Sequence, residues 1–174
     1  MIYFTTIFVF LILVLIFESS NNFKKNKFLY FLIYFFLVIF IGLRYWVGGD
    51  WGGYATDIAE LNADLINSKL YELFYGLNFQ PHQGYLLLLY FVSFFSTKIY
   101  MVNFIAAMIF CYGLIRLSIK QPYPLLSIYV GYCYFAVVYG MNFTKQSIAL
   151  GFIMLILSIN EKKIKTKIIL FLIA

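Results

Sequence analysis

Apolar blocks separated by short polar gaps run along the chain and constrain its fold more than any other feature. The blocks are residues 1–17, 28–43, 84–97, 99–115, 122–141 and 146–160, with an incomplete one beginning at Ile168. Most come close to the roughly 20 residues that a helix needs to cross the hydrocarbon core of a bilayer. Because lipid offers no partner to a backbone amide, and because the alternation of a barrel strand is absent, these blocks predict helices. We therefore expect an all-α fold, a polytopic transmembrane helix bundle of about six membrane helices.

The composition excludes an ordinary soluble domain. Of the 174 residues, 64% are hydrophobic and 11% are charged, whereas a soluble domain carries about a quarter charged residues. The net charge is +6, but the basic residues sit in the gaps between apolar blocks. They indicate topology and contact with membrane lipid, not the binding of nucleic acid. Cys111 and Cys133 stand alone in apolar stretches, which predicts buried thiols and no zinc or redox site.

The basic residues predict which way the helices cross. They cluster at Lys24, Lys25 and Lys27, at Arg116 and Lys120, and at 162–167, and cytoplasmic loops carry such an excess. An even number of crossings must separate two cytoplasmic clusters, yet three apolar blocks lie between the first and the second. We predict that 84–97 does not cross and forms a re-entrant or interfacial helix; a true short crossing that breaks the charge rule is the alternative. The chain is then a multi-pass plasma-membrane protein with its N-terminus outside.

Residues 44–83 form the one long polar stretch and, on this topology, an extracytoplasmic loop. Five of the seven acidic residues lie in it. From Tyr54 to Leu73 the apolar side chains share one side of a helical wheel, which predicts an amphipathic surface helix. Its acidic stripe of Asp57, Glu60 and Asp64 has oxygen ligands for a divalent cation, but a solvated helix face explains it better, so no metal site is predicted.

The chain as a whole is predicted to form a single transmembrane domain over residues 1–174. Its last apolar block contains only seven residues, from Ile168 to Ala174. That length is far below the roughly 20 residues of a crossing. We therefore expect this sequence to be the N-terminal part of a longer protein.

Arg44 stands where the second block leaves the lipid, ahead of a glycine-rich stretch that contains Asp50. An arginine can fork two hydrogen bonds onto a phosphate or a carboxylate, and Asp50 can orient the arginine or a substrate hydroxyl. The alternative is an interfacial anchor belt of Arg44, Tyr45 and Trp46 before a glycine turn. The residues alone favour this alternative.

A second polar cluster opens the block 146–160, where Asn142, Lys145 and Gln146 lie on the same predicted outer side as Arg44. A helix N-terminus favours anions and Lys145 adds a point charge, so a phosphate fits here; a snorkelling lysine is the equally weighted alternative. His82 is the only histidine. It has the chemistry for proton transfer, although a lone loop histidine usually has no such role. The common metalloprotease, hydrolase, Walker and Rossmann signatures are missing from the sequence.

Three stretches resemble, in their order along the chain, the Wzy/EpsG-type polysaccharide polymerases of bacterial capsule, exopolysaccharide and O-antigen synthesis. Residues 42–54 are similar to the pattern G-L-R-Y-x-V-G-x-D-x-x-x-Y, residues 80–87 to E-P-x-Y-x-L-L, and residues 141–149 to M-N-x-x-R-Q-x-x-A. The sequence departs from these patterns at Gln80, where the family usually has glutamate, and at Lys145, where it usually has arginine. Lysine lacks the planar fork of arginine, which weakens the phosphate recognition expected there.

The resemblance implies transfer of a polyprenyl-diphosphate-linked oligosaccharide onto another lipid-linked repeat unit. The reaction is expected on the outer face of the bacterial plasma membrane, beside other polysaccharide assembly proteins. The residues expected to bind substrate are Arg44, Tyr45, Tyr54, Asn142, Lys145 and Gln146, and those expected in catalysis are Asp50 and His82. The donor is already activated by its diphosphate, so the scheme needs no cofactor and no metal. We expect the full-length protein to be a glycosyltransferase-type polymerase and this stretch alone to be inactive.

Two other functions stay open. A transporter or flippase carries ionisable residues deep inside its helices, whereas almost every charge here lies at the end of a block or in a gap. A non-catalytic membrane component of a polysaccharide export system would tolerate the replacement of Arg44, Asp50 and Lys145.

Overall fold

The described part of the chain is helical, as the sequence predicts. The computed structural model describes residues 2–18, 26–44, 47, 51–53, 83–96, 98–134 and 144–159, and within these ranges there is no β-strand. The helices are α1 (Ile2–Phe17), α3 (Lys27–Gly42), α6 (Gln83–Ser93), α7 (Ile99–Ser118), α8 (Pro124–Gly131) and α9 (Thr144–Ser158). The all-α prediction is therefore confirmed for this part of the protein.

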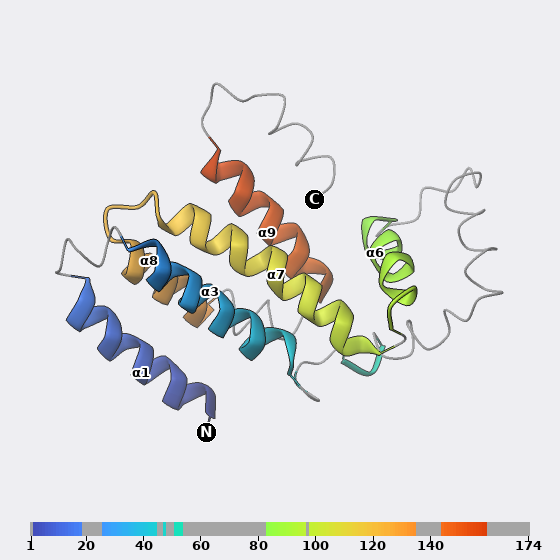
Figure 1. Ribbon diagram of the computed structural model, residues 1–174, viewed down its shortest axis with the longest axis horizontal. Helices are drawn as coiled ribbons and strands as arrows, with labels where there is room; N and C mark the ends of the chain where they lie inside the picture. Colours follow the sequence, from blue (N-terminus) through green and yellow to red (C-terminus); the bar gives the residue numbers. More distant parts are fainter. Residues whose placement is uncertain are drawn as a thin grey trace.

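Helix α7 is the centre of the bundle, with α3 on one side and α9 on the other (Figure 1). Helix α3 runs antiparallel to α7, because Gly42 at its end lies against Phe104 near the start of α7. Helix α9 runs parallel to α7, since its first residue, Thr144, contacts Asn103 and its Gly151 lies against Phe110. The end of α3 and the beginnings of α7 and α9 therefore meet at one end of the bundle.

Glycines allow α7 and α9 to pack with their backbones in contact. A Cβ atom on Gly113 would meet the carbonyl oxygen of Gly151, and a Cβ on Gly151 would lie 2.9 Å from the Cα of Phe110. Small residues at such a crossing let two membrane helices approach closely and gain van der Waals contact. This pair sets the distance between the two helices.

Helix α1 is attached to α8 by polar and aromatic contacts. The Oε2 atom of Glu18 accepts a 2.8 Å hydrogen bond from the backbone N–H of Leu126, in the first turn of α8. Thr6 and Tyr132 share a 2.7 Å hydrogen bond through their hydroxyls, and the rings of Phe10 and Tyr132 meet edge to face with centroids 5.8 Å apart. Glu18 thereby satisfies an N–H group that the turns inside α8 leave open.

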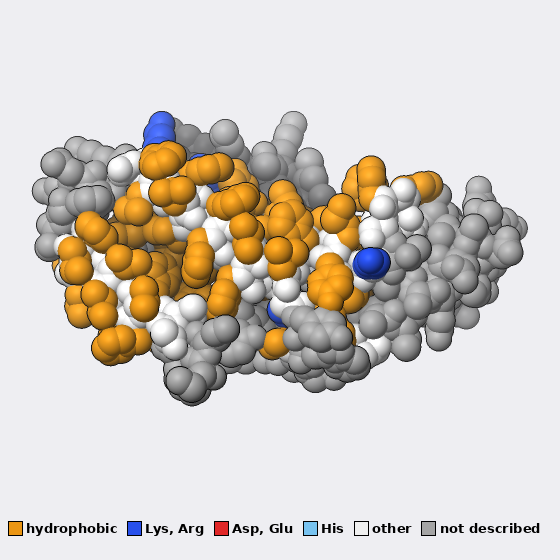
Figure 2. Space-filling view, turned by 60° about the horizontal axis from the view of Figure 1, so that its bottom comes forward, with side chains coloured by type: hydrophobic (Ala, Val, Ile, Leu, Met, Phe, Trp, Pro, Cys, Tyr) orange, Lys and Arg blue, Asp and Glu red, His pale blue; other side chains and the backbone are white. Residues whose placement is uncertain are grey.

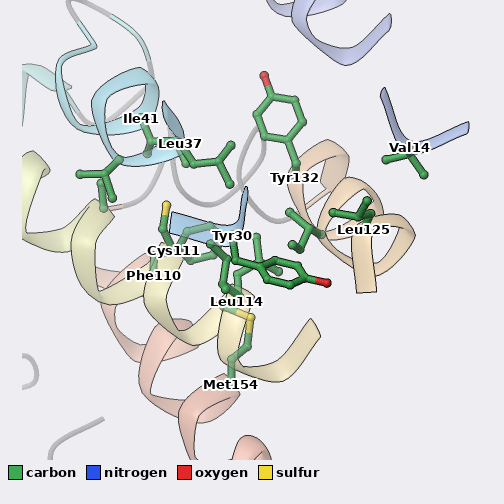
Figure 3. Close-up of a cluster of buried hydrophobic side chains, with 14 residues drawn as sticks. Val14, Tyr30, Leu37, Ile41, Phe110, Cys111, Leu114, Leu125, Tyr132 and Met154 are labelled. Atoms are coloured by element: carbon green, nitrogen blue, oxygen red, sulfur yellow. The ribbon is translucent and has the colours of Figure 1, made fainter. Parts of the chain in front are cut away.

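The main hydrophobic core lies between these helices and is drawn in Figure 3. The cluster contains Leu37 and Ile41 of α3, Phe110 and Leu114 of α7, and Tyr132 after α8. Cys111 is buried in this core and Cys133 is half-buried, and both are free thiols. The prediction of buried thiols therefore holds fully only for Cys111.

The structure does not confirm six membrane-spanning helices. Among the described residues, one helix, Ile99–Ser118 with its 20 residues, is long and apolar enough to cross a membrane. Shorter apolar helices are α3, α9 and, within α1, Thr5–Phe17. Large apolar side chains also cover much of the face in Figure 2. Helices α1, α3 and α6 all carry exposed phenylalanines. An apolar surface of this kind is typical of contact with lipid or with another protein.

The block predicted as a re-entrant or interfacial helix over 84–97 forms the shorter helix α6, Gln83–Ser93. Its 11 residues rise about 16 Å at 1.5 Å per residue, roughly half of the hydrocarbon thickness. The block predicted over 122–141 begins as α8 at Pro124 and winds as a π-helical turn over 132–134. Proline favours the first helical position, which explains the later start.

The charged ends of the helices separate as the topology prediction requires. Lys27 begins α3, and Arg116 and Lys120 lie at the end of α7, so these cations share one end of the bundle. Arg44 and Lys145 lie at the opposite end. Some predictions fall outside the described residues. They concern the surface helix from Tyr54 to Leu73, the cations Lys24 and Lys25, those of 162–167, and the block beginning at Ile168.

Candidate functional site

Arg44, Asn103 and Thr144 form a polar junction where three helices meet. The Nη2 atom of Arg44 donates to the Oδ1 atom of Asn103 at 3.0 Å and to the Oγ1 atom of Thr144 at 2.8 Å. The Thr144 hydroxyl donates to the same Asn103 oxygen at 2.9 Å. Nη1 of Arg44 also donates to the carbonyl oxygen of Ile41 at 3.1 Å, which ties the side chain back to its own helix.

The polar junction is buried. Arg44 is 6% exposed, Asn103 is 1% exposed and Thr144 is fully buried. The four hydrogen bonds above all end on neutral oxygens. The guanidinium keeps its charge, since arginine is not deprotonated in proteins. A buried arginine bonded to two other helices is not an interfacial anchor pointing to the headgroups, so the anchor-belt interpretation of Arg44 is wrong.

The Asn103 amide has one orientation that fits its neighbours. Its oxygen must face Arg44, because a guanidinium only donates hydrogen bonds. The nitrogen, Nδ2, is buried, and no hydrogen-bond acceptor for it lies within the part of the chain that the structure describes. The polar junction thus contains a cation, a helix N-terminus and a buried amide donor side by side.

Lys145 follows Thr144, and its side chain reaches the ring of Tyr85. Its Nζ lies 4.7 Å from the centroid of the Tyr85 ring of α6, within the range of a cation–π contact. The Tyr85 ring packs in a second buried cluster, whose members are Trp51, Tyr85, Leu89, Val92, Ile99 and Val102. Helix α6 is therefore held against the same end of the bundle as the polar junction.

The three sequence stretches that resemble the polymerase motifs are brought together at this end. Arg44 comes from the first stretch, Tyr85 from the second, and Thr144 and Lys145 from the third. Arg44 bonds to Thr144 across 100 residues, and Lys145 lies over Tyr85. Segments far apart in sequence thus share one site.

The other predicted site residues divide into two groups. Gln146 is exposed on the first turn of α9. The remaining ones lie outside the described residues, namely Tyr45, Asp50, Tyr54, His82 and Asn142. Within the described ranges, no three His, Cys, Asp or Glu side chains gather closely enough to hold a metal ion.

Sequence reasoning missed Asn103 and Thr144 as site residues. Asn103 is a polar residue inside the apolar block 99–115, and a polar side chain within a membrane segment is a signal of function or of helix packing. Thr144 sits at an unspecified position of the third motif, so the motif gives it no weight. Tyr85 was included in the second stretch without a role of its own.

Comparison with known proteins assigns the chain to a family. No curated protein and no solved structure matches it. The model of the EpsG family matches residues 27–174, from the first residue of α3 onward. Since this match covers most of the chain and includes all three motif stretches, the protein belongs to the EpsG family and is a membrane protein of polysaccharide biosynthesis.

Proposed function

We propose that the protein polymerises polysaccharide repeat units on the outer face of the bacterial plasma membrane. It transfers a lipid-diphosphate-linked oligosaccharide onto another lipid-linked unit. Membership of the EpsG family supports the biosynthetic role. The observation that carries the finer proposal is the polar junction, because it joins two motif stretches through Arg44 and Thr144.

The polar junction supplies what the departing diphosphate needs. In the reaction, an acceptor hydroxyl attacks the anomeric carbon, the bond from that carbon to the phosphate oxygen breaks, and the lipid diphosphate leaves with the electron pair. Negative charge grows on the phosphate, and preorganised donors in a water-poor site stabilise such charge strongly. Arg44 and the N-terminus of α9 are placed to do this.

The hydroxyl of the acceptor must lose its proton during the same step. Asp50 and His82 are the candidates for the base or for an orienting contact. The motif stretches that contain them also contain Arg44 and Tyr85, which lie at the described site. Tyr45, Tyr54, Asn142, Lys145 and Gln146 complete the proposed substrate-binding set. Other polysaccharide assembly proteins are the proposed partners.

The decisive experiment replaces Arg44 by alanine in the full-length protein in its host. We expect loss of long-chain polymer and accumulation of single repeat units on the lipid carrier, measured by gel electrophoresis and mass spectrometry. Arg116→Ala is the matched control, since Arg116 is exposed at the opposite end of the bundle. Normal chain length in Arg44→Ala, at normal protein abundance, would overturn the proposal.

A flippase for the lipid-linked unit is a second candidate, because Arg44 and Asn103 are buried polar residues inside a membrane bundle. The two functions differ in where the substrate accumulates in Arg44→Ala. Loss of a polymerase leaves repeat units on the outer leaflet, where a membrane-impermeant reagent reaches them. Loss of a flippase leaves them on the inner leaflet.

A further inference from the structure

We propose that Asn103 is a further substrate-binding residue, whose Nδ2 amide donates a hydrogen bond to a phosphate oxygen of the lipid diphosphate beside Arg44. This inference rests on the proposed function and adds a residue and a bond type to it. It assigns a role to a side chain from the middle of the apolar helix α7.

The Asn103 amide has a fixed orientation. Its Oδ1 atom accepts from Arg44 at 3.0 Å and from Thr144 at 2.9 Å, and these two bonds fix the plane of the side chain. A flipped amide would place a nitrogen against the donor-only guanidinium. Nδ2 therefore points away from these two partners, with both of its N–H bonds directed elsewhere.

The Asn103 amide is also buried. Asn103 is 1% exposed, and Nδ2 has no acceptor among the described residues. Buried polar groups in native proteins are almost always hydrogen-bonded, because an amide donor removed from water without an acceptor costs free energy. A buried donor of this kind indicates that a bound substrate supplies its acceptor.

The groups that surround the amide favour an anion. Arg44 carries a positive charge, and Thr144 is the first residue of α9, where the helix dipole favours an anion. All these groups prefer an acceptor with negative charge. The ligand that fits is therefore an oxyanion, and neither a cation nor a neutral hydrogen-bond donor.

The experiment measures binding of farnesyl diphosphate to the purified full-length protein in detergent. Asn103→Asp keeps the oxygen that Arg44 and Thr144 need but replaces the donor by an acceptor. Asn103→Leu removes the donor and the accepting oxygen together, without adding charge. We expect both variants to raise the Kd by about tenfold or more, because a hydrogen bond to a charged group is lost.

A matched control is Ser158→Ala. Ser158 is also a buried polar residue, with its Oγ bonded to the carbonyl oxygen of Leu155 at 2.7 Å, but it lies at the far end of α9. We expect its Kd to equal that of the unmodified protein. Inorganic pyrophosphate and farnesol are tested as competitors of farnesyl diphosphate. Competition by pyrophosphate alone indicates that the site binds the phosphate groups. Competition by farnesol indicates binding through the lipid chain, which contradicts the inference.

The outcomes separate this inference from the proposed function. If Asn103→Asp binds farnesyl diphosphate like the unmodified protein while Arg44→Ala does not, Asn103 merely positions Arg44 and the inference is wrong. If both Asn103 variants lose binding but Arg44→Ala cells make normal polymer, the phosphate site stands and the polymerase proposal fails. Should Asn103→Asp not accumulate, unchanged binding of farnesyl diphosphate by Asn103→Leu would still overturn the inference, since leucine has no donor.

Discussion

Gly113 of α7 and Gly151 of α9 lie so close that a Cβ atom on Gly113 would meet the carbonyl oxygen of Gly151. This contact lies about two helical turns along α9 from Thr144. Because α9 is one continuous helix from Thr144 through Gly151, the glycine pair determines how near Thr144 comes to Asn103. The polar junction thus depends on a backbone contact that contains no polar side chain.

Replacing Gly113 by alanine should therefore weaken both the fold and the site. The added methyl group meets backbone atoms that cannot rotate away, so α7 and α9 must separate. We expect the free energy of unfolding to fall by about 1–3 kcal/mol, as for other overpacked cores. Thermal unfolding of the purified protein in detergent measures this change.

A matched glycine tests whether the effect comes from the helix contact. A Cβ atom on Gly52 would have nothing within 4 Å, so Gly52→Ala should leave the unfolding temperature unchanged. Equal unfolding temperatures for Gly113→Ala and Gly52→Ala would contradict the importance of the close approach.

Local pattern was enough to predict the positions of α3 and α7. The block predicted at 28–43 became α3, Lys27–Gly42, and its start is explained by Asn26, whose side chain accepts from the N–H groups of Phe28 and Leu29. The block predicted at 99–115 continues to Ser118 in α7. Arg116 marked the end of the apolar run but not of the helix, because a cation is favourable in the last turn of a helix.

The contacts between helices were beyond the reach of local pattern. The hydropathy pattern gives Gly113 and Gly151 no particular role, and it contains no information that the two residues face each other. The same holds for Asn103, which is one polar residue in an apolar block until Arg44 and Thr144 are placed beside it. Arg44 and Lys145 share one end of the bundle, in agreement with the pattern of the basic clusters. That this end is extracytoplasmic stays a prediction.

Lys145 offers a test of charge at the proposed substrate site. Lys145→Arg restores the residue usual in the resembling motif and keeps a cation over Tyr85, so we expect normal or longer polymer chains. Lys145→Gln removes the charge, and we expect shorter chains in the same host. Electrophoresis of the polymer compares the two variants at equal protein abundance. Unchanged chain length in Lys145→Gln would show that the charge has no role in polymerisation.

Glu18 should stabilise α8 as a capping residue supplied by another helix. The N-cap position of α8, Tyr123, provides no side-chain hydrogen bond, whereas the Glu18 carboxylate accepts from Leu126 at 2.8 Å. Glu18→Ala should lower the free energy of unfolding by about 1 kcal/mol, as for other lost caps. Gln121→Ala, at an exposed neighbouring position, is the control and should have no such effect. A Glu18→Ala protein as stable as this control would argue against capping.

The orientation of the bundle in the membrane can be tested by cysteine labelling. Gln146 is exposed at the end that carries the polar junction, and Gln121 is exposed near the other end, just after α7. In a background with Cys111 and Cys133 replaced by serine, Gln146→Cys should react with an impermeant maleimide in intact cells, because the proposed lipid-diphosphate substrate is bound on the outer face. Gln121→Cys should react only after permeabilisation, since the neighbouring Arg116 and Lys120 belong on the cytoplasmic side. If Gln121→Cys reacts in intact cells and Gln146→Cys does not, the polar junction faces the cytoplasm and polymerisation on the outer face is excluded. If both cysteines react in intact cells, α7 does not cross the membrane.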